Sequence, residues 1–364
     1  MRYLNIDTAK PISKIGLGTW QFGSRKWGYG EAYSQRTAIS IVRRAVELGV
    51  TLFDTAEIYA GGRSERILGG ALGDDRESVC IAGKLFPLTP TGPLVRQRAK
   101  ASASRLGVSR LDLYQVHYPN PLGDDRAIMN DMRLLQHAGL VGEVGVSAYS
   151  VERWESAELA LGSRVLSNQV QYSLVSRGPE RAILPFAQEH GRVVIAFSPL
   201  AHGLLSGRYN ESNLPTDRVR SDSPYFQPDS LARTTPLLKV LREVADAHSA
   251  TPAQIALAWV IRHPAVAAIP GASSIEQLES NVSAVEIELS DDEDRALRES
   301  SSWSCAPELQ PSPVHRDLEM FRHTLRVAPY LAGTAWNDFC RALSRRASGR
   351  DAAGLRRSKG ARAA

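Results

Sequence analysis

The chain has 364 residues, of which 43% are hydrophobic and 23% are charged, and its formal net charge is +5. This length suffices for one large core of roughly 250–300 residues with an appendage. No stretch approaches the ~20 apolar residues that span a bilayer, and the first residues lack an apolar run of signal-peptide length. The three cysteines, Cys80, Cys305 and Cys340, are too dispersed to suggest a zinc site or a disulfide framework. We therefore expect a cytoplasmic protein without a membrane anchor.

The positive charge is concentrated at the C-terminal end. Residues 341–364 contain eight Lys or Arg and one Asp, a net charge of +7, which leaves −2 for the other 340 residues. Such a segment can contact nucleic acid or anionic lipid. This one has no interleaved aromatic residues, so we favour a disordered solubilising tail over 345–364 and do not expect a nucleic-acid partner.

Strand-like and helix-like patterns alternate along most of the chain. After a first short apolar segment at 15–18, the expected elements in chain order are a helix at 37–48, a strand at 51–54, a helix at 64–72, a strand at 79–84, a helix at 93–106, a strand at 111–117, a helix at 125–138, a strand at 144–147, a helix at 151–161, a strand at 165–170, a helix at 179–190, a strand at 193–197, a long polar loop at 206–230, helices at 236–248 and 252–262, a strand at 265–269 and a helix at 275–282.

Eight strands with helices between them predict an α/β fold with a parallel sheet, and eight repeats favour a closed (β/α)₈ TIM barrel over an open sheet. The glycine pattern supports this choice. Gly16 and Gly18 are followed by Gln21 where a dinucleotide fingerprint has its third glycine, and they precede a loop rather than a helix. A bound nucleotide would therefore not be held in the Rossmann manner.

The alternation stops near residue 300. Beyond it, apolar residues at helical spacing predict two amphipathic helices that pack on the barrel. These residues are Leu318, Phe321, Leu325, Trp336, Phe339, Cys340 and Leu343. We therefore expect a barrel over 1–300, a C-terminal helical extension over 301–344 and the basic tail over 345–364.

Four residues with chemically useful side chains lie at or just beyond strand ends: Asp54, Tyr59, Lys84 and His117. The carboxyl ends of parallel strands meet at one rim of a barrel, where barrel enzymes keep their chemistry. An acid, a phenol, a cation and an imidazole are thus predicted to converge. Each residue alone is more often a cap or a core residue, so the joint arrangement carries the prediction.

These four side chains suggest acid–base chemistry at a carbonyl oxygen. A buried lysine needs a partner, which Asp54 supplies. A lysine beside a tyrosine favours tyrosinate, so we expect Lys84 to lower the pKa of Tyr59 from ~10 towards the working range. The phenol would then be a general acid in reduction and a general base in oxidation, and a neutral His117 would orient the carbonyl oxygen.

The chain resembles the aldo-keto reductases, in particular the bacterial branch related to potassium-channel β-subunit-like members. The resemblance covers about residues 3–300. It rests on the segments Ile15–Trp20, Phe53–Tyr59, Lys84, Gln115–His117, Gly145–Ser147, Asn168–Tyr172, Phe197–Leu200 and Ile269–Ser273 together with Asn281. It implies a single barrel that binds NADP(H) and reduces aldehydes or ketones. His117 is not the glutamate of members that reduce enone double bonds, which favours carbonyl reduction.

The resemblance also implies a cofactor site. Ser147 and Gln169 match residues that hold the nicotinamide carboxamide, and Phe197 matches the aromatic residue on which the nicotinamide stacks. The full set of implied cofactor-binding residues is Gly18, Thr19, Trp20, Ser147, Gln169, Phe197, Ser198, Pro199, Leu200, Gly203, Gly271, Ser273, Gln277 and Asn281. No metal is implied.

Two departures from the family pattern affect cofactor binding. Ala148 stands where an asparagine usually follows the serine, so one amide contact is lost. Gly271 and Gln277 occupy positions at which other members use a lysine and an arginine to grip the 2′-phosphate. On family precedent we favour NADPH/NADP+ over NADH.

The expected partner is a small-molecule carbonyl substrate, and Trp20, Trp27 and Tyr29 are expected to line its pocket. The physiological substrate and the oligomeric state stay open. Two other functions also stay open: a cofactor-binding sensor or partner protein with slow turnover, and a biosynthetic reductase of a keto-sugar or polyketide intermediate.

Overall fold

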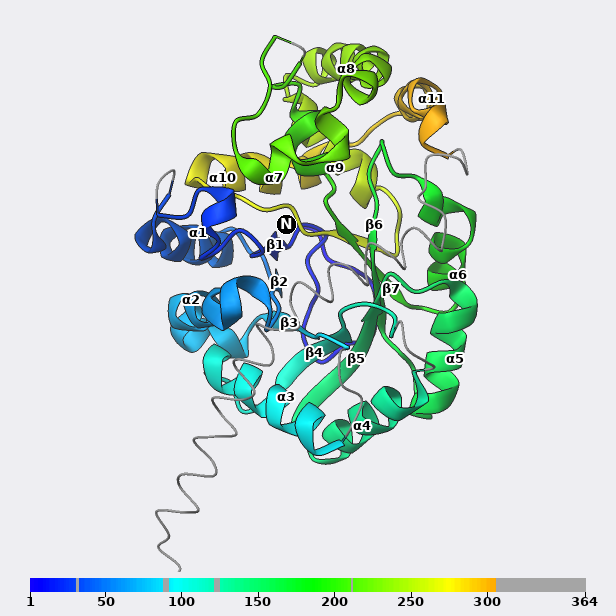
Figure 1. Cartoon of the computed structure of the whole chain (residues 1–364). Coiled ribbons are helices and arrows are strands. Elements are labelled where there is room, and N and C mark those ends of the chain that lie inside the picture. The colour runs from blue at the N-terminus through cyan, green and yellow to red at the C-terminus, as the bar shows by residue number, and fades with distance from the viewer. Residues whose placement is uncertain (31–32, 88–91, 121–124, 211, 306–364) are drawn as a thin grey trace, which may run out of the picture. The chain divides into compact units, whose positions relative to one another are not determined.

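The computed structural model describes residues 1–30, 33–87, 92–120, 125–210 and 212–305 (Figure 1). Eight parallel strands form one sheet in which each strand pairs with the next along the chain. The strands are β1 (Leu17–Gly18), β2 (Leu52–Asp54), β3 (Cys80–Leu85), β4 (Leu111–Val116), β5 (Val141–Ser147), β6 (Ser167–Gln171), β7 (Val193–Phe197) and β8 (Val266–Ala268).

The sheet closes on itself between the first and last strands. Ile15 forms a parallel bridge with Ala268, whose carbonyl accepts a hydrogen bond from Gly16 N at 2.8 Å. The amide of Ala268 in turn donates to the carbonyl of Lys14 at 2.8 Å. The predicted (β/α)₈ barrel is therefore confirmed.

Side chains alternate between the inside and the outside of the barrel, as the period of two requires. Leu52, Ala82 and Ile195 belong to a buried cluster inside the barrel. Their neighbours Phe53 and Ile81 belong to the separate, larger core that packs against the helices. Near the carboxyl ends of the strands, the positions that face the interior carry polar residues. The interior is therefore apolar at one end of the barrel and polar at the other, the rim.

The strands are surrounded by helices, as Figure 1 shows. The helices are α1 (Gln35–Glu47), α2 (Arg63–Leu72), α3 (Gly92–Leu106), α4 (Arg126–His137), α5 (Val151–Leu161), α6 (Ile183–Glu189), α7 (Arg218–Ser221), α8 (Pro228–Ala247), α9 (Pro252–Ile261), α10 (Ile275–Ser283) and α11 (Asp291–Ser300).

Two predicted helix starts were wrong by four or more residues, and one helix was missed. Helix α6 begins at Ile183 rather than at 179, because Gly178–Arg181 forms a separate 3-10 turn. Helix α8 begins at Pro228 and continues through Pro236, so it takes up part of the predicted loop. Helix α11 was not predicted, although Ser290 and Glu293 form a capping box at its start.

The predicted helical extension over 301–344 and the tail over 345–364 fall almost entirely outside the described residues. The exception is the short 3-10 helix Ser302–Cys305, beside which Arg177 Nη1 donates to Ser301 Oγ at 3.2 Å. Within the described residues, no helix has the length and apolar character needed to cross a membrane.

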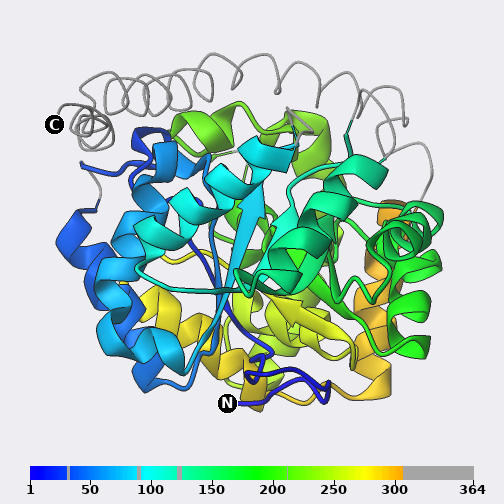
Figure 2. The same cartoon turned by 90° about the horizontal axis from the view of Figure 1, so that it is seen from below.

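The N-terminal residues close the end of the barrel that lies opposite the carboxyl ends of the strands. Residues 3 and 13 form an antiparallel bridge, and Leu4 and Ile12 join the interior cluster. Figure 2 shows these first residues, in dark blue, across the lower end of the barrel. The chemistry-bearing rim is therefore the open end.

A buried lysine secures the seam between β1 and β8. Lys14 Nζ donates to the carbonyls of Ile261, His263 and Pro264 at 3.1, 2.6 and 3.0 Å. Burial lowers the pKa of this amine to about 8, which leaves it protonated at neutral pH. The Lys14 ammonium thus binds three carbonyls, one at the last residue of α9 and two in the loop between α9 and β8.

We expect Lys14→Met to lower the free energy of unfolding by at least about 2 kcal/mol, since hydrogen bonds from a charged donor contribute about 1.5–3 kcal/mol each. Urea unfolding measures this change. Lys239→Met is the matched control, because Lys239 is 78% exposed and lies 3.8 Å from Glu243. The control should change stability by less than about 0.5 kcal/mol; equal effects of the two substitutions would contradict the role of Lys14.

Candidate active site

The four predicted chemistry-bearing residues lie together at the open rim. Asp54 ends β2, Lys84 is the penultimate residue of β3, and His117 directly follows β4. Tyr59 begins a 3-10 turn after β2. Asp54, Lys84 and His117 are buried, whereas the Tyr59 side chain is partly exposed.

Lys84 is the centre of this group. Its Nζ lies 2.5 Å from Asp54 Oδ1 and 3.1 Å from Tyr59 Oη, and it also donates to the Thr55 carbonyl at 3.2 Å. The lysine thus contacts both the acid and the phenol, as the sequence predicted.

The direction in which the pKa of Tyr59 shifts differs from our expectation. Burial, helped by the negative charge of Asp54, raises the pKa of the Tyr59 phenol well above 10. Burial also lowers the pKa of Lys84, against the attraction of Asp54. Desolvation of the phenolate therefore outweighs the help that Lys84 gives it, and the phenol keeps its proton at neutral pH.

The imidazole of His117 lies edge-on to Tyr59, with 5.7 Å between the ring centroids. Its other neighbour is Tyr118, whose ring stacks on it at 4.6 Å and an interplanar angle of 9°. The backbone amide of His117 donates to the Leu85 carbonyl at 2.9 Å. Sequence analysis missed Tyr118, because nothing in the sequence tells a stacked ring from an ordinary loop tyrosine.

One predicted cofactor residue, Gln169, contacts Asp54 directly, and a second, Ser147, contacts Gln169. Gln169 Nε2 donates to Asp54 Oδ2 at 2.8 Å, and Ser147 Oγ donates to the Gln169 carbonyl at 3.0 Å. Both carboxylate oxygens of Asp54 are therefore bonded. The neighbouring Ala148 has φ +60°, a left-handed conformation that asparagine adopts more readily than alanine.

The segment after β7 is unusually rich in left-handed backbone. Ser198, Ala201, His202 and Gly203 have φ of +49°, +48°, +58° and +98°. The amides of Ala201 and Gly203 donate to the carbonyls of Ser198 and Leu200, both at 2.9 Å, so the segment forms successive tight turns. The predicted residues Phe197, Pro199 and Leu200 belong to the same strand end and turn.

The predicted adenosine-end residues gather at the start of α10. Gln277 Oε1 accepts from the amide and the hydroxyl of Ser273, both at 3.0 Å. Asn281 Nδ2 donates to the Gly271 carbonyl at 3.4 Å. Across the β1–β8 seam, Gln21 Nε2 donates to the Ala272 carbonyl at 3.0 Å, which brings the β1 loop to this group.

Thr19 differs from the other predicted cofactor residues. It is fully buried, its Oγ1 donates to the Asp54 carbonyl at 2.8 Å, and it also bonds to Ser64. These contacts join the ends of β1 and β2, so the side chain supports the site rather than facing a ligand.

An aromatic wall lines one side of the rim. It consists of Trp20, Trp27, His202 and Tyr225, whose ring centroids lie 5.1–6.1 Å from their neighbours in the wall. The Arg220 guanidinium lies 5.0 Å from the Trp27 ring and donates to the His202 carbonyl at 2.8 Å.

Sequence analysis found only the two tryptophans of this wall, because Tyr225 lies in 206–230, which reads as a polar loop, and no local pattern distinguishes His202. The third aromatic residue predicted for the substrate pocket, Tyr29, packs against Tyr33 instead.

Three further features of the rim concern Gly18, Trp27 and His202. A Cβ at Gly18 would lie 2.7 Å from the Ile269 carbonyl oxygen, so this position stays free of a side chain. Trp27 Nε1 and His202 Nδ1 are buried without a hydrogen-bond partner in the described part of the chain. Burial, with Arg220 nearby, lowers the pKa of His202 to about 4, so its ring is neutral at pH 7.

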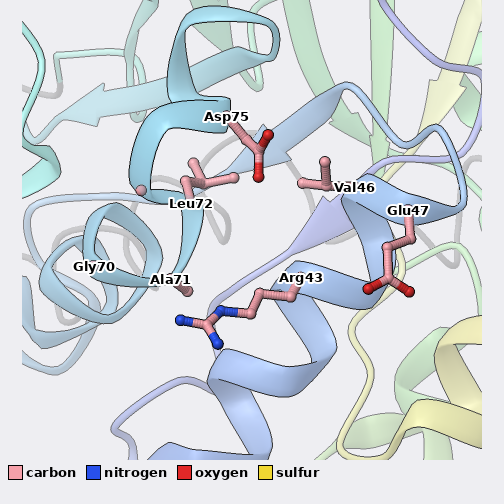
Figure 3. A pocket seen from close by; sticks show the side chains of 8 residues that line it. Arg43, Val46, Glu47, Gly70, Ala71, Leu72 and Asp75 are labelled. Carbon is pink, nitrogen blue, oxygen red and sulfur yellow. The ribbon is translucent and has the colours of Figure 1, made fainter.

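A pocket lies elsewhere in the described part of the chain. Figure 3 shows a space of about 440 Å³ between the C-terminal ends of α1 and α2, beside Arg43, Glu47 and Asp75. The chain leaves these helix ends to enter β2 and β3, so the pocket is at the end of the barrel opposite the rim. None of its lining residues is a predicted site residue.

A protein-family model, the aldo/keto reductase family, matches residues 14–301 of this sequence. The chain belongs to the aldo/keto reductase family. It is therefore an oxidoreductase of the class that acts on small carbonyl compounds.

Individual relatives agree with this assignment. An uncharacterized oxidoreductase of Mycobacterium tuberculosis is 54% identical over 290 residues, which cover 80% of this chain and 90% of that protein. A methylglyoxal reductase of Escherichia coli is 33% identical over 280 residues, which cover 77% and 87%. A crystal structure of an aldo-keto reductase from Klebsiella pneumoniae in complex with NADPH has a TM-score of 0.66 and 29% identity, and the match covers 84% and 96%.

Replacing Ala148 by Asn tests the left-handed position beside Ser147. Asparagine is several-fold enriched at such φ values, so we expect a gain in stability of up to about 1 kcal/mol in urea unfolding. If the side-chain amide also reaches the nicotinamide carboxamide, NADPH should bind roughly 2- to 12-fold more tightly, as expected for about 0.5–1.5 kcal/mol.

Ser249→Asn is the matched control for this substitution. Ser249 has φ +50° and lies in the α8–α9 loop, and it is not one of the predicted cofactor residues. It should gain stability without a change in NADPH affinity as measured by fluorescence titration. A similar gain in affinity in both variants would contradict a direct contact from position 148.

Proposed function

We propose that this protein reduces an aldehyde or ketone to an alcohol with NADPH, and that Tyr59 donates the proton. The observation that carries the proposal is the position of Lys84, whose Nζ contacts both Asp54 and Tyr59 at the rim. The NADPH complex of the Klebsiella pneumoniae relative supports the choice of cofactor.

The proposed cofactor site follows the rim from β5 to β8 and back to β1. Ser147 and Gln169 would hold the nicotinamide end, and Phe197 would stack on its ring. The turn containing Ser198, Pro199, Leu200 and Gly203 would hold the phosphates. The adenosine end would lie at Gly271, Ser273, Gln277 and Asn281, with Gly18 and Trp20 completing the β1 side and the buried Thr19 supporting it. When bound, NADPH supplies the hydride.

Tyr59 is suited to act as a general acid. Its raised pKa keeps the phenol protonated at neutral pH, so a proton is available for the developing alkoxide. Lys84 stabilises the phenolate that remains after transfer, and Asp54 holds the ammonium in place. Because His117 lies edge-on to Tyr59, both can approach the same carbonyl oxygen.

Small aldehydes and dicarbonyls are the first substrates to test. This proposal draws on the methylglyoxal reductase of Escherichia coli, which is 33% identical. Trp20, which is 44% exposed, and Trp27 would present aromatic surface to the substrate. A panel that also includes keto-sugars, assayed with NADPH and NADH, separates this function from a biosynthetic reductase. Tight cofactor retention with negligible turnover of every carbonyl would instead indicate a sensor.

We expect Tyr59→Phe to lower kcat by at least about 100-fold, the lower range of general acid–base contributions, because the phenylalanine has no proton to give. NADPH affinity should stay nearly unchanged. Steady-state kinetics with methylglyoxal and a fluorescence titration with NADPH provide the two measurements. Wild-type turnover in this variant would exclude Tyr59 as the proton donor.

The pH dependence should differ between the two directions of reaction. Reduction uses the protonated phenol, so its kcat should stay level from pH 6 to 8 and be lost only as the pH rises through the raised pKa of Tyr59. Oxidation of the alcohol uses the phenolate, so its kcat should increase up to at least about pH 10.

Lys84→Met removes the charge that stabilises the phenolate and should lower activity in both directions. A Lys84→Met enzyme with the wild-type pH profile would argue against this electrostatic role.

A further inference from the structure

A second buried ion pair lies directly behind the proposed catalytic group. Glu57, which is 8% exposed, accepts a hydrogen bond from Arg98 Nε at 3.1 Å, and a second Arg98 nitrogen also bonds to the carboxylate. Arg98 comes from α3, whereas Glu57 lies in the loop between β2 and α2. The contact is bidentate, which fixes the relative orientation of the two side chains.

Both partners of this pair also bind the end of β3. Glu57 Oε1 accepts from the backbone amide of Phe86 at 2.7 Å, and Arg98 Nη2 donates to the Phe86 carbonyl at 2.6 Å. Both the backbone amide and the backbone carbonyl of Phe86 thus form hydrogen bonds with this pair. Because Phe86 directly follows β3, the pair fixes the direction in which the strand leaves the barrel.

These anchor points lie very close in sequence to the catalytic group. Glu57 precedes Tyr59 by two residues, and Phe86 follows Lys84 by two residues. The 3.1 Å contact between Lys84 and Tyr59 therefore spans two segments that Glu57 ties together.

His117 is attached to the same strand end. Its amide donates to the Leu85 carbonyl, and its ring lies 6.1 Å from the Phe86 ring. A shift of the β3 end would move His117 together with Lys84.

We propose that Glu57, held by Arg98, is a positioning residue that sets the separation of Tyr59, Lys84 and His117. The hydrogen bonds that Glu57 forms in the described part of the chain go to Arg98 and to the Phe86 amide, so its effect acts through the backbone of the β2–α2 loop and of β3. The inference rests on the proposed proton transfer from Tyr59.

The chain contains a matched pair of the same kind. Glu65 in α2 is fully buried and bonds to Arg105 in α3. Glu65 and Arg105 thus join the neighbouring helices α2 and α3 (Figure 1), much as Glu57 and Arg98 join the preceding loop to α3. Among the described residues, the side-chain hydrogen bonds of Glu65 and Arg105 stay within α2 and α3 and do not reach a strand end. Comparing substitutions in the two pairs therefore distinguishes the effect of losing a buried ion pair from the effect of misaligning the side chains at the site.

The experiment compares Glu57→Ala with Glu65→Ala in the full-length protein. The measurements are melting temperature, NADPH dissociation constant, KM and kcat for methylglyoxal, and the solvent isotope effect on kcat. Both variants should melt at lower temperature, since each leaves an arginine without its partner. Assays are run well below both melting temperatures.

Only Glu57→Ala should lower kcat, by roughly 10- to 100-fold, because a displacement of about 1 Å at the reacting groups has an effect of that size. Its solvent isotope effect should rise as proton transfer becomes slower, while its NADPH dissociation constant stays within about twofold of wild type. Glu65→Ala should keep kcat within about twofold. If Glu57→Ala does not fold, Glu57→Gln against Glu65→Gln provides the same comparison with smaller changes.

Unchanged kcat in the Glu57 variants, or an equal fall in kcat for both pairs, would overturn the inference. The Tyr59→Phe variant distinguishes this failure from failure of the proposed function. If Tyr59→Phe loses turnover while Glu57→Ala keeps it, only the positioning role is wrong. If Tyr59→Phe keeps turnover, the proton-transfer proposal itself fails.

Discussion

The ion pair between Lys84 and Asp54 is the interaction on which the rest of the site depends. Both side chains point into the barrel and are almost completely removed from water. A single charge buried there would be strongly destabilising, so each residue requires the other. Gln169 reaches the second oxygen of Asp54 from β6, which extends the contact across the barrel. Strands β2, β3 and β6 are thereby joined at one carboxylate.

This arrangement leaves one donor of Lys84 directed at the phenol of Tyr59. The same burial that makes the ion pair obligatory also holds the proton on Tyr59, because phenolate is poorly solvated there. The protein thus favours a protonated phenol beside a fixed cation, a combination suited to giving up a proton as negative charge develops nearby.

The convergence of these residues was predictable because it depends on strand ends. Apolar runs of four to seven residues that alternate with helical patterns give the order of the barrel, and the barrel places Asp54, Lys84 and His117 on one rim. Helix boundaries were less predictable where a proline is tolerated, as at Pro236, or where a capping box starts a helix of low hydrophobicity, as at Ser290.

Other features of the site depend on contacts that local pattern does not encode. The stacking of Tyr118 on His117 and the position of Arg220 over Trp27 require loops to meet in space. The pKa shift of Tyr59 was predicted with the wrong sign, because residue types indicate which charges are near but not how much water is excluded. The Glu57–Arg98 pair likewise joins a loop and a helix 41 residues apart.

The seam secured by Lys14 has a consequence for how the barrel forms during synthesis. The carbonyls that Lys14 binds lie about 250 residues later in the chain. Until the ribosome has released β8, the first strand has a free edge, and Leu4 and Ile12 lack much of the interior against which they pack. A nascent chain that stalls before this point exposes both an unpaired strand edge and apolar residues, the combination that promotes aggregation and chaperone binding.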